Sequence, residues 1–143
     1  MRWREYSPAA QHVPSQTVTE LVAEARRVGA DAMVSFGGGS PIDTVKNAAW
    51  QLMGGRAGSR TTDFASAATT SSSGGEILHI ALPTTLSAGE FTPGGGVTDE
   101  STKVKSVVGD PRLQARAEEV KHANTVGVEV TLEQLVGILD AAY

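Results

Sequence analysis

Apolar residues recur at helical spacing from Thr17 onward, and this periodicity predicts the first helix of the chain. Thr17 together with Glu20 has the form of a capping box, and Gly29 stands where helices commonly end. We therefore expect an amphipathic helix from Thr17 to Val28. The apolar positions on its inner face are Val18, Leu21, Val22, Ala25 and Val28.

A short apolar run from Ala32 to Phe36 follows, and it stops at the three glycines 37–39. Together with the residues beyond, it predicts a buried parallel strand, a turn without side chains and the start of a helix. In that start, Ser40 is the expected N-cap, Pro41 the first helical residue and Asp43 the second half of a capping box. The apolar face of the helix is expected at Ile42, Val45, Ala49 and Leu52.

The strand–glycine–helix junction is the first candidate for chemistry. Backbone N–H groups at a helix N-terminus are unpaired, and glycines allow an anion to approach them closely. Spacing alone leaves two interpretations open, a phosphate cradle or a tight turn without a ligand. The GxGxxG pattern of dinucleotide-binding turns is not present.

A second strand and loop follow later in the chain. Residues 54–76 are mostly Gly, Ser, Thr and Ala and predict a long flexible loop. Ile77–Leu82 then predicts a strand too apolar to lie at a sheet edge, and the loop at 83–90 is rich in hydroxyl groups. Parallel strands open their carboxyl ends on the same side of a sheet, where α/β folds bind ligands. The two loops are therefore expected to share one crevice, which favours a nucleotide.

The remaining pattern completes the expected fold. Gly94–Asp99 and Lys103–Val108 predict a β-hairpin, and the charged stretch Arg112–Lys121 predicts an exposed helical segment. Thr131 is the expected cap of a final helix. We expect an α/β fold: a partial doubly wound, Rossmann-like parallel sheet with flanking helices, a β-hairpin and a helical C-terminal tail. The inner face of the final helix is expected at Leu132, Leu135, Val136 and Leu139.

Composition narrows the function classes. The chain has 143 residues, a net charge of −4 and no block of Lys or Arg, so we expect neither a nucleic-acid nor a membrane partner. Cysteine is absent, which excludes disulfides and thiol catalysis. No apolar segment of signal-peptide length opens the sequence, and a cytoplasmic protein is the expected class.

Three ordered motifs carry a family resemblance. Gly37–Lys46 reads GGGSPIDTVK, which is similar to the GGGSxxDxxK motif of the iron-containing alcohol dehydrogenase superfamily. Pro83–Thr92 resembles the PTT…E loop of that superfamily in the shorter form of its maleylacetate reductase branch. Val97–Glu100, followed by Lys105 and then by Asp110 with Pro111, continues the likeness, which covers roughly His12–Leu113.

The resemblance implies an NAD(P)H-dependent reductase that converts 2-maleylacetate to 3-oxoadipate in the degradation of aromatic compounds. It implies NAD(H) or NADP(H) as cofactor, held by an N-terminal α/β domain. Carried over motif by motif, the cofactor-binding residues would be Gly38, Gly39 and Ser40 at the diphosphate, Asp43 beside them, Thr84, Thr85 and Ser87 from the second loop, and Lys105 near the ribose.

Departures from the family pattern set further expectations. Family members carry a metal and substrate site on a C-terminal helical domain, which we expect to be absent here, so no metal and no catalytic residue is expected in this chain. Residues 1–113 would form an incomplete dinucleotide-binding domain, and residues 114–143 a divergent tail with a terminal helix. Whether such a chain turns over substrate alone is left open. The alternative is a non-catalytic nucleotide-phosphate-binding or oligomerisation module, as a homodimer or with a complementing chain.

Four side chains have simpler interpretations. Asp43 and Lys46 have the spacing of an ion pair on the helix surface. His79 lies in an apolar strand and is expected to be a packed or hydrogen-bonded core histidine rather than a metal ligand. Glu90 is given no role as a general base.

Overall fold

The computed structural model describes residues 3–56 and 74–114. Along them lie α1 (Ser15–Val28), β1 (Ala32–Gly37), α2 (Gly39–Leu52), β2 (Leu78–Pro83), η2 (Gly89–Phe91), β3 (Gly94–Thr98), β4 (Lys105–Gly109) and η3 (Pro111–Leu113). The expected α/β fold is confirmed. The centre of the predicted loop at 54–76, most of the charged segment Arg112–Lys121 and the final helix from Thr131 lie outside the described residues.

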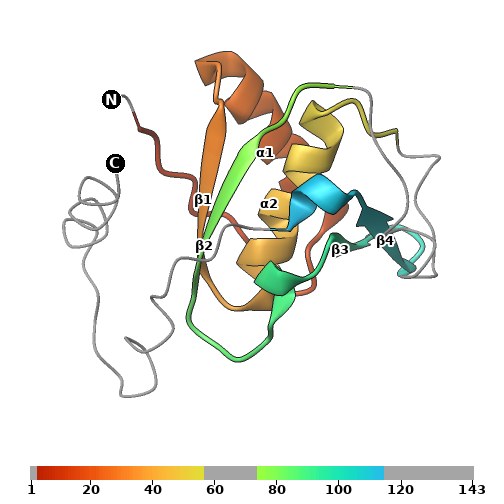
Figure 1. Ribbon diagram of the computed structural model, residues 1–143. Coiled ribbons are helices and arrows are strands. Elements are labelled where there is room, and N and C mark those ends of the chain that lie inside the picture. Colours follow the sequence, from red (N-terminus) through yellow and green to blue (C-terminus); the bar gives the residue numbers. More distant parts are fainter. Residues whose placement is uncertain (1–2, 57–73, 115–143) are drawn as a thin grey trace.

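Helix α2 is the central element of this fold. Figure 1 shows the β1–β2 sheet on one side of it and the β3–β4 hairpin on the other, with α1 packed alongside. Helix α2 contacts α1, both sheets and the short helices η2 and η3. Residues on α2 are thus placed to connect the glycine turn with the hairpin.

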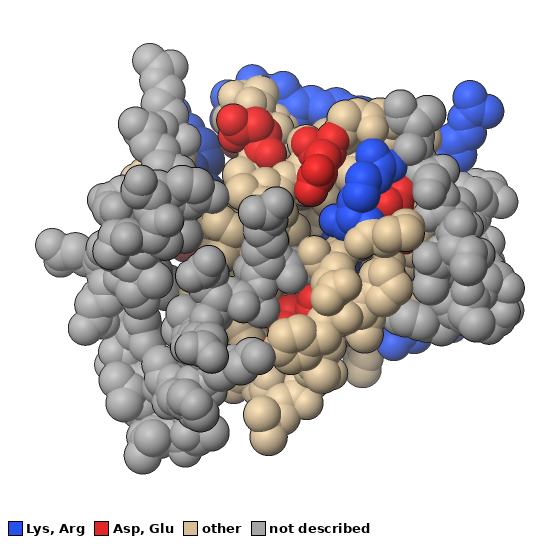
Figure 2. All heavy atoms as spheres, viewed as in Figure 1, with Lys and Arg blue, Asp and Glu red and all other residues tan. Residues whose placement is uncertain are grey.

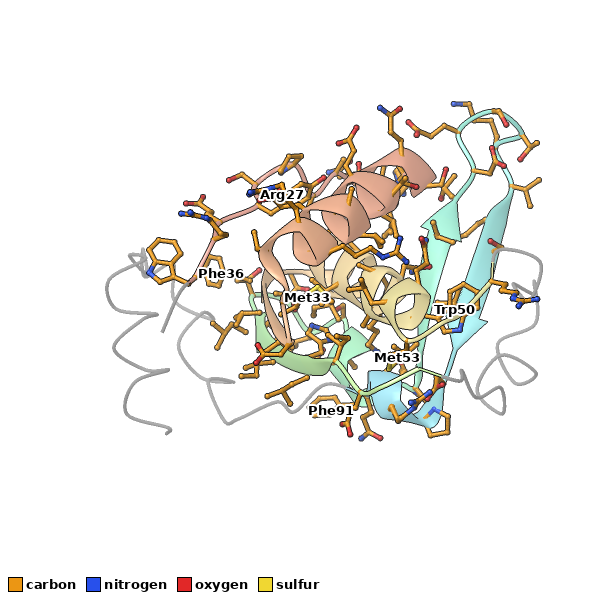
Figure 3. All side chains as sticks on the ribbon, turned by 90° about the horizontal axis from the view of Figure 1, so that it is seen from above. Arg27, Met33, Phe36, Trp50, Met53 and Phe91 are labelled. Carbon is orange, nitrogen blue, oxygen red and sulfur yellow. The ribbon has the colours of Figure 1, made fainter. Side chains whose placement is uncertain are left out.

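The first sheet has a parallel register that runs from the pair Ala32–Leu78 to the pair Gly37–Pro83. Met33 and Ser35 of β1 are buried on its helix-covered face, whereas Val34 and Phe36 are 43% and 46% exposed on the other. Figure 3 shows Met33 among the helices and Phe36 apart from them. Within the described residues β2 pairs with β1 alone, so the second neighbour expected for so apolar a strand is not among them.

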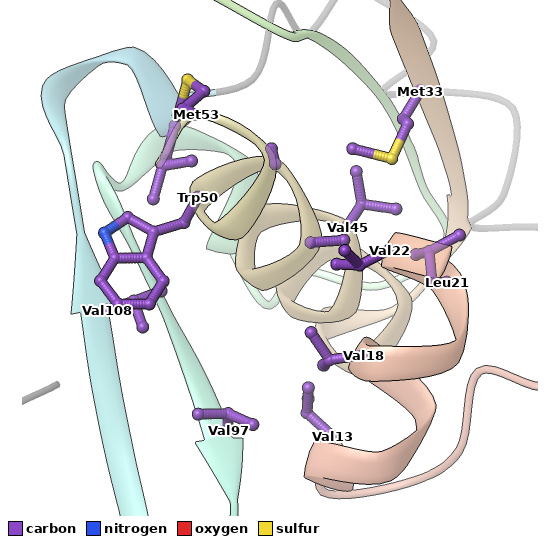
Figure 4. Packing of buried hydrophobic residues seen from close by; sticks show 13 residues of the cluster. Val13, Val18, Leu21, Val22, Met33, Val45, Trp50, Met53, Val97 and Val108 are labelled. Atoms are coloured by element: carbon purple, nitrogen blue, oxygen red, sulfur yellow. The ribbon is translucent and has the colours of Figure 1, made fainter. Parts of the chain in front are cut away.

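The hydrophobic core lies between α1, α2 and the inner faces of the strands, as Figure 4 shows. Most of the predicted apolar positions of both helices are buried, which confirms the two inner faces except at their ends: Val28 is 40% exposed and Leu52 is half-buried. The N-terminal segment contributes Val13, which is 3% exposed and whose carbonyl accepts a hydrogen bond from the Thr98 N–H at 2.9 Å. The larger members of the core are Val18, Leu21, Val22, Met33, Val45, Trp50, Met53, Val97 and Val108.

The predicted N-caps are wrong in both helices. Helix α2 begins at Gly39 with Gly38 as its N-cap, so Ser40 and Pro41 already lie in the first turn. The extended backbone of Gly38 (φ −81°, ψ −159°) lets the chain pass from strand to helix without a capping side chain. Asp43 does not cap the helix either, because its carboxylate is engaged by a neighbouring strand.

Helix α1 shows the same shift at its start and the expected end. Pro14 is its N-cap and Ser15 its first residue, so Thr17 lies inside the helix and caps nothing. Glu20 instead accepts a hydrogen bond from the Gln16 side chain at 2.9 Å. The predicted end is confirmed, since Gly29 adopts the left-handed conformation (φ 67°, ψ 43°) that favours glycine.

Candidate functional site

The two loops that the sequence placed at one crevice do meet. Gly37, the last residue of β1, is in register with Pro83, the last residue of β2. The Thr84 N–H then donates to the Gly37 carbonyl at 2.9 Å, which extends the pairing past both strand ends. Figure 1 shows both loops leaving the sheet at the same end. This confirms the shared sheet end on which the nucleotide expectation depends.

The glycine turn has no side chains where the second loop approaches it. A Cβ atom on Gly38 would lie 3.2 Å from the Thr85 hydroxyl oxygen, and one on Gly39 would lie 3.4 Å from the Ser87 Cβ. Gly37 has φ 138°, a backbone conformation that residues other than glycine rarely adopt, and a Cβ there would lie 2.8 Å from Pro41 Cγ. The glycines thus let the second loop pack directly against the backbone of the turn.

Polar groups of both loops are available at this place. The N–H groups of Gly39 and Ser40 open α2, so the helix has no carbonyl to pair them with, and the positive end of its dipole lies there. Thr85 and Ser87 are exposed, and Thr84 is half-buried. An arrangement of free amides and neutral hydroxyls suits a phosphate oxygen.

Asp43 and Lys105 extend the site toward the hairpin. The Asp43 carboxylate accepts a hydrogen bond from the Gly96 N–H at 3.0 Å. A Cβ on Gly96 would lie 2.6 Å from Lys105 Cε and 3.5 Å from the Asp43 Oδ2 atom, so the lysine chain crosses the glycine beside the carboxylate. Burial raises the pKa of Asp43, while the Gly96 hydrogen bond, Lys46 and Lys105 act in the opposite direction. The structure therefore links the predicted residues of α2 and the hairpin.

Lys46 occupies a place that the sequence did not predict. The expected surface ion pair with Asp43 is wrong, since Lys46 is fully buried (0% exposed) and its ammonium is surrounded by backbone oxygens. Nζ donates to the carbonyl oxygens of Gly89 and Thr92, and it also reaches the Gly94 carbonyl and the Thr92 hydroxyl, each at 3.1 Å. Burial lowers the pKa of Lys46 to about 8, against the opposing charges of Asp43 and Glu90.

Two further polar groups beside Lys46 also escaped the sequence analysis. The Asn47 amide donates to the carbonyl oxygens of Asp43 at 2.8 Å and Gly96 at 3.0 Å. Glu90 is 3% exposed, and its Oε2 atom has no hydrogen-bond partner in the part of the chain that the structure describes.

One feature of the sequence could have indicated that Lys46 and Asn47 are buried against a strand. The run Gly94–Gly96 brings a strand without side chains against a helix, and such a run marks a close approach of backbone. A Cβ on Gly95 would lie 3.1 Å from Asn47 Nδ2 and 3.1 Å from Lys46 Cβ.

His79 behaves as expected of a core histidine. It is 3% exposed, and its Nε2 atom lies 2.8 Å from the Ser35 hydroxyl across the β1–β2 pair. Burial lowers its pKa to about 3, with a smaller contribution from the nearby charge of Lys46. The imidazole is thus neutral at ordinary pH, and its contacts are those of a buried hydrogen-bonded pair.

The described residues offer neither a metal site nor a membrane span. No three His, Cys, Asp or Glu side chains among residues 3–56 and 74–114 come together in a way that could hold a metal ion. No helix in the same two ranges has the length and apolar character needed to cross a bilayer. On the face in Figure 2, basic side chains lie among acidic and neutral ones.

The family can now be assigned from comparison with known proteins. The family model of the iron-containing alcohol dehydrogenases matches residues 1–118. The chain belongs to the iron-containing alcohol dehydrogenase family. The match includes the glycine turn, the second loop and the hairpin, which confirms the resemblance drawn from the three motifs.

Similar proteins within the family include several maleylacetate reductases. The maleylacetate reductase of Burkholderia cepacia is 33% identical over 114 residues, which are 73% of this chain and 26% of that protein. That of Sphingobium indicum is 29% identical over 117 residues, 76% of this chain and 27% of that protein. This chain therefore spans about a quarter of the length of these relatives.

Solved structures agree with this assignment. The crystal structure of maleylacetate reductase from Agrobacterium tumefaciens superposes with a TM-score of 0.58 at 27% identity, covering 78% of this chain and 25% of that one. An iron-containing alcohol dehydrogenase from Thermococcus thioreducens, at 23% identity, has a TM-score of 0.62 over 76% of this chain and 29% of its own, and supports the fold alone.

Proposed function

We propose that this chain binds the diphosphate of NAD(H) or NADP(H) at the glycine turn. It would be the cofactor-binding part of a cytoplasmic reductase of maleylacetate reductase type, acting on 2-maleylacetate in aromatic-compound degradation. Membership of the oxidoreductase family and the maleylacetate reductases among its relatives support this. Residues 1–113 would supply the dinucleotide-binding domain, and residues 114–143 a divergent tail.

Each predicted residue has a distinct task in this proposal. The N–H groups of Gly39 and Ser40 would donate to diphosphate oxygens, and Gly38 would keep the space for them open. Thr84, Thr85 and Ser87 would close over the diphosphate from the second loop with neutral hydroxyl groups. Asp43 would hold the adjoining hairpin strand, and Lys105 would place a positive charge toward the ribose.

The nicotinamide supplies the hydride when the cofactor is bound. The family name implies iron as well, but the described residues contain no cluster able to hold it, so iron enters no step here. That this chain needs no metal remains a prediction. The contribution of the described residues is to bind the cofactor and fix its orientation.

The single observation that carries the proposal is the meeting of the two loops. The Thr84–Gly37 hydrogen bond at 2.9 Å and the approach of Thr85 to Gly38 support the proposal, because both bring the second loop against the start of α2. A turn that only reversed the chain would not need a second, hydroxyl-bearing loop against it. This favours a phosphate cradle over a tight turn without a ligand.

Calorimetric titration with NADH, NADPH and inorganic pyrophosphate tests the proposal. We expect heat from at least one dinucleotide, competition by pyrophosphate, and no competition by nicotinamide mononucleotide at equal concentration. Loss of NADH absorbance on addition of maleylacetate would show that the chain is active alone. Absence of heat at millimolar concentrations of either dinucleotide, with the chain folded by circular dichroism, contradicts the proposal.

A second candidate is an association module without chemistry. Val34 and Phe36 leave an apolar strip exposed on the uncovered face of β1, and a strip of this kind favours association with another chain. Light scattering at increasing protein concentration tests it. A concentration-dependent dimer that Phe36→Ser reduces to a monomer supports this candidate, and a monomer at all concentrations contradicts it.

A further inference from the structure

The oxygen atoms around Lys46 form a closed receptor for one ammonium group. Its Nζ reaches four oxygens, three backbone carbonyls and one hydroxyl, all contributed by the segment 89–94. An ammonium has three N–H donors and no acceptor, so several converging carbonyls satisfy it without a carboxylate in contact. The Thr92 hydroxyl itself donates within the same group, to Gly89 O at 2.9 Å or Gly94 O at 3.0 Å.

This receptor lies at the far end of the second loop. The loop is fixed at its start by the Thr84–Gly37 hydrogen bond, and its hydroxyl residues 85 and 87 are exposed between the two anchors. Residues 89 and 92 are held by Lys46 from α2, whose own first turn provides the glycine turn amides. One helix therefore holds the loop and presents the amides opposite it.

We propose that Lys46 is a positioning residue: its ammonium fixes the second loop, Thr84–Thr92, so that Thr85 and Ser87 stand over the glycine turn. Lys46 makes no contact with the cofactor in this account. It determines cofactor affinity through the place of the two hydroxyl side chains. The inference rests on the proposed cofactor site for its effect on binding, but its effect on the loop is independent of any ligand.

Charge around Lys46 shows why an ammonium is retained in a buried position. Asp43 from its own helix and Glu90 from η2 favour the charged form, while His79 from β2 is neutral, and Lys105 from the hairpin lies beside Asp43. Burial opposes the charge and lowers the pKa of Lys46 to about 8. The ammonium is therefore lost as the pH rises through that value, at which point a neutral amine cannot satisfy the four oxygens.

Hydrogen exchange and cofactor titration on Lys46→Met test the proposal. The methionine side chain matches that of lysine in length as far as Cε and lacks the ammonium. We expect protection factors of the Phe91 and Thr92 amides to fall by about tenfold or more, with α1 unchanged, and NADH affinity to fall by a similar factor. In the unchanged protein the same amides should lose protection as the pH rises through the Lys46 pKa of about 8, and in Lys46→Met this step should be absent. Arg26→Met, which removes an exposed charge from α1, should change neither readout.

Chemical rescue separates charge from packing. In Lys46→Ala, propylammonium replaces the missing atoms and should restore loop protection, whereas propanol of similar shape should not. Unchanged protection of the second loop in Lys46→Met overturns the proposal, as does equal rescue by propanol. Failure of Lys46→Met to fold also overturns it, because the lysine would then act on the whole fold. If the loop loosens and the unchanged protein binds no dinucleotide, the positioning role stands and the proposed cofactor site fails.

Discussion

The contact between α2 and β3 gives a sharp prediction, because a single methyl group at Gly95 tests it. In Gly95→Ala the new Cβ would lie 3.1 Å from Asn47 Nδ2, 3.1 Å from Lys46 Cβ and 3.4 Å from the Asp43 carbonyl oxygen. Ordinary van der Waals separations for such atoms are about 3.5–4 Å, so a shift of a few tenths of an ångström is required. The Asn47 amide cannot give way freely, since it is tied to Asp43 O and Gly96 O.

The expected cost follows from which atoms can move. Lys46 Cβ is fixed to the helix backbone, so α2 and β3 must separate, and overpacking of this kind costs about 1–3 kcal/mol. Replacing glycine returns about 0.4–1 kcal/mol by restricting the unfolded chain. We expect a net loss of about 1–2 kcal/mol in the free energy of unfolding.

Urea denaturation followed by tryptophan fluorescence and circular dichroism measures this loss. The matched control is Gly75→Ala, since a Cβ on Gly75 meets nothing within 4 Å. The control should stay within about 0.5 kcal/mol of the unchanged protein. Equal midpoints for the two variants would refute the close approach of α2 and β3, and with it the geometry of the Lys46 receptor.

Two further predictions concern the glycine turn and the buried histidine. Gly37→Ala should lower the free energy of unfolding by more than Gly29→Ala. Both glycines have positive φ, but a Cβ on Gly37 would also lie 2.8 Å from Pro41 Cγ, whereas a Cβ on Gly29 has no atom within 4 Å. Equal losses in urea denaturation would contradict this prediction. The pKa of His79 is about 3 in the folded protein and near 6.5 in the unfolded chain, so between these values only the unfolded chain binds the proton. The neutral, buried His79 therefore stabilises the fold fully above pH 6.5, and this stabilisation is lost as the pH falls toward 3. Between about pH 7 and pH 5 the unchanged protein should lose about 2 kcal/mol more than His79→Leu in urea denaturation, and parallel losses would show that the histidine is not buried as described.

Much of the fold could be predicted because periodicity and glycine placement are local signals. The apolar spacing of α1 and α2, the strand before Gly37 and the hairpin around Asp99 all follow from neighbouring residues. The caps could not be predicted in the same way, because Ser40 and Thr17 are good capping residues in isolation. Helix α1 begins directly after Pro14 and helix α2 directly after Gly38, so each helix starts before the residue predicted to cap it.

Part of the candidate site could also be predicted from the sequence, and part could not. Gly38, Thr85 and Ser87 could be placed together from strand order alone, since parallel strands end at one edge. Lys46 could not, because the oxygens that surround it come from residues more than forty positions away. A buried lysine and a surface lysine look alike in a helical pattern, and the close approach that distinguishes them is signalled by the glycines of β3 instead.

The most direct test of the central claim is the affinity for NADH after Gly38→Val. Gly38 has an extended backbone that any residue adopts, so valine strains no dihedral angle there. Its side chain would enter the space between the two loops, where a Cβ would lie 3.2 Å from the Thr85 hydroxyl. The account predicts that Gly38→Val, at a temperature where circular dichroism shows both variants folded, loses NADH affinity by about tenfold or more relative to Gly75→Ala. Equal NADH affinity in the two variants would contradict it, because the glycine turn could not then be the place where the diphosphate binds.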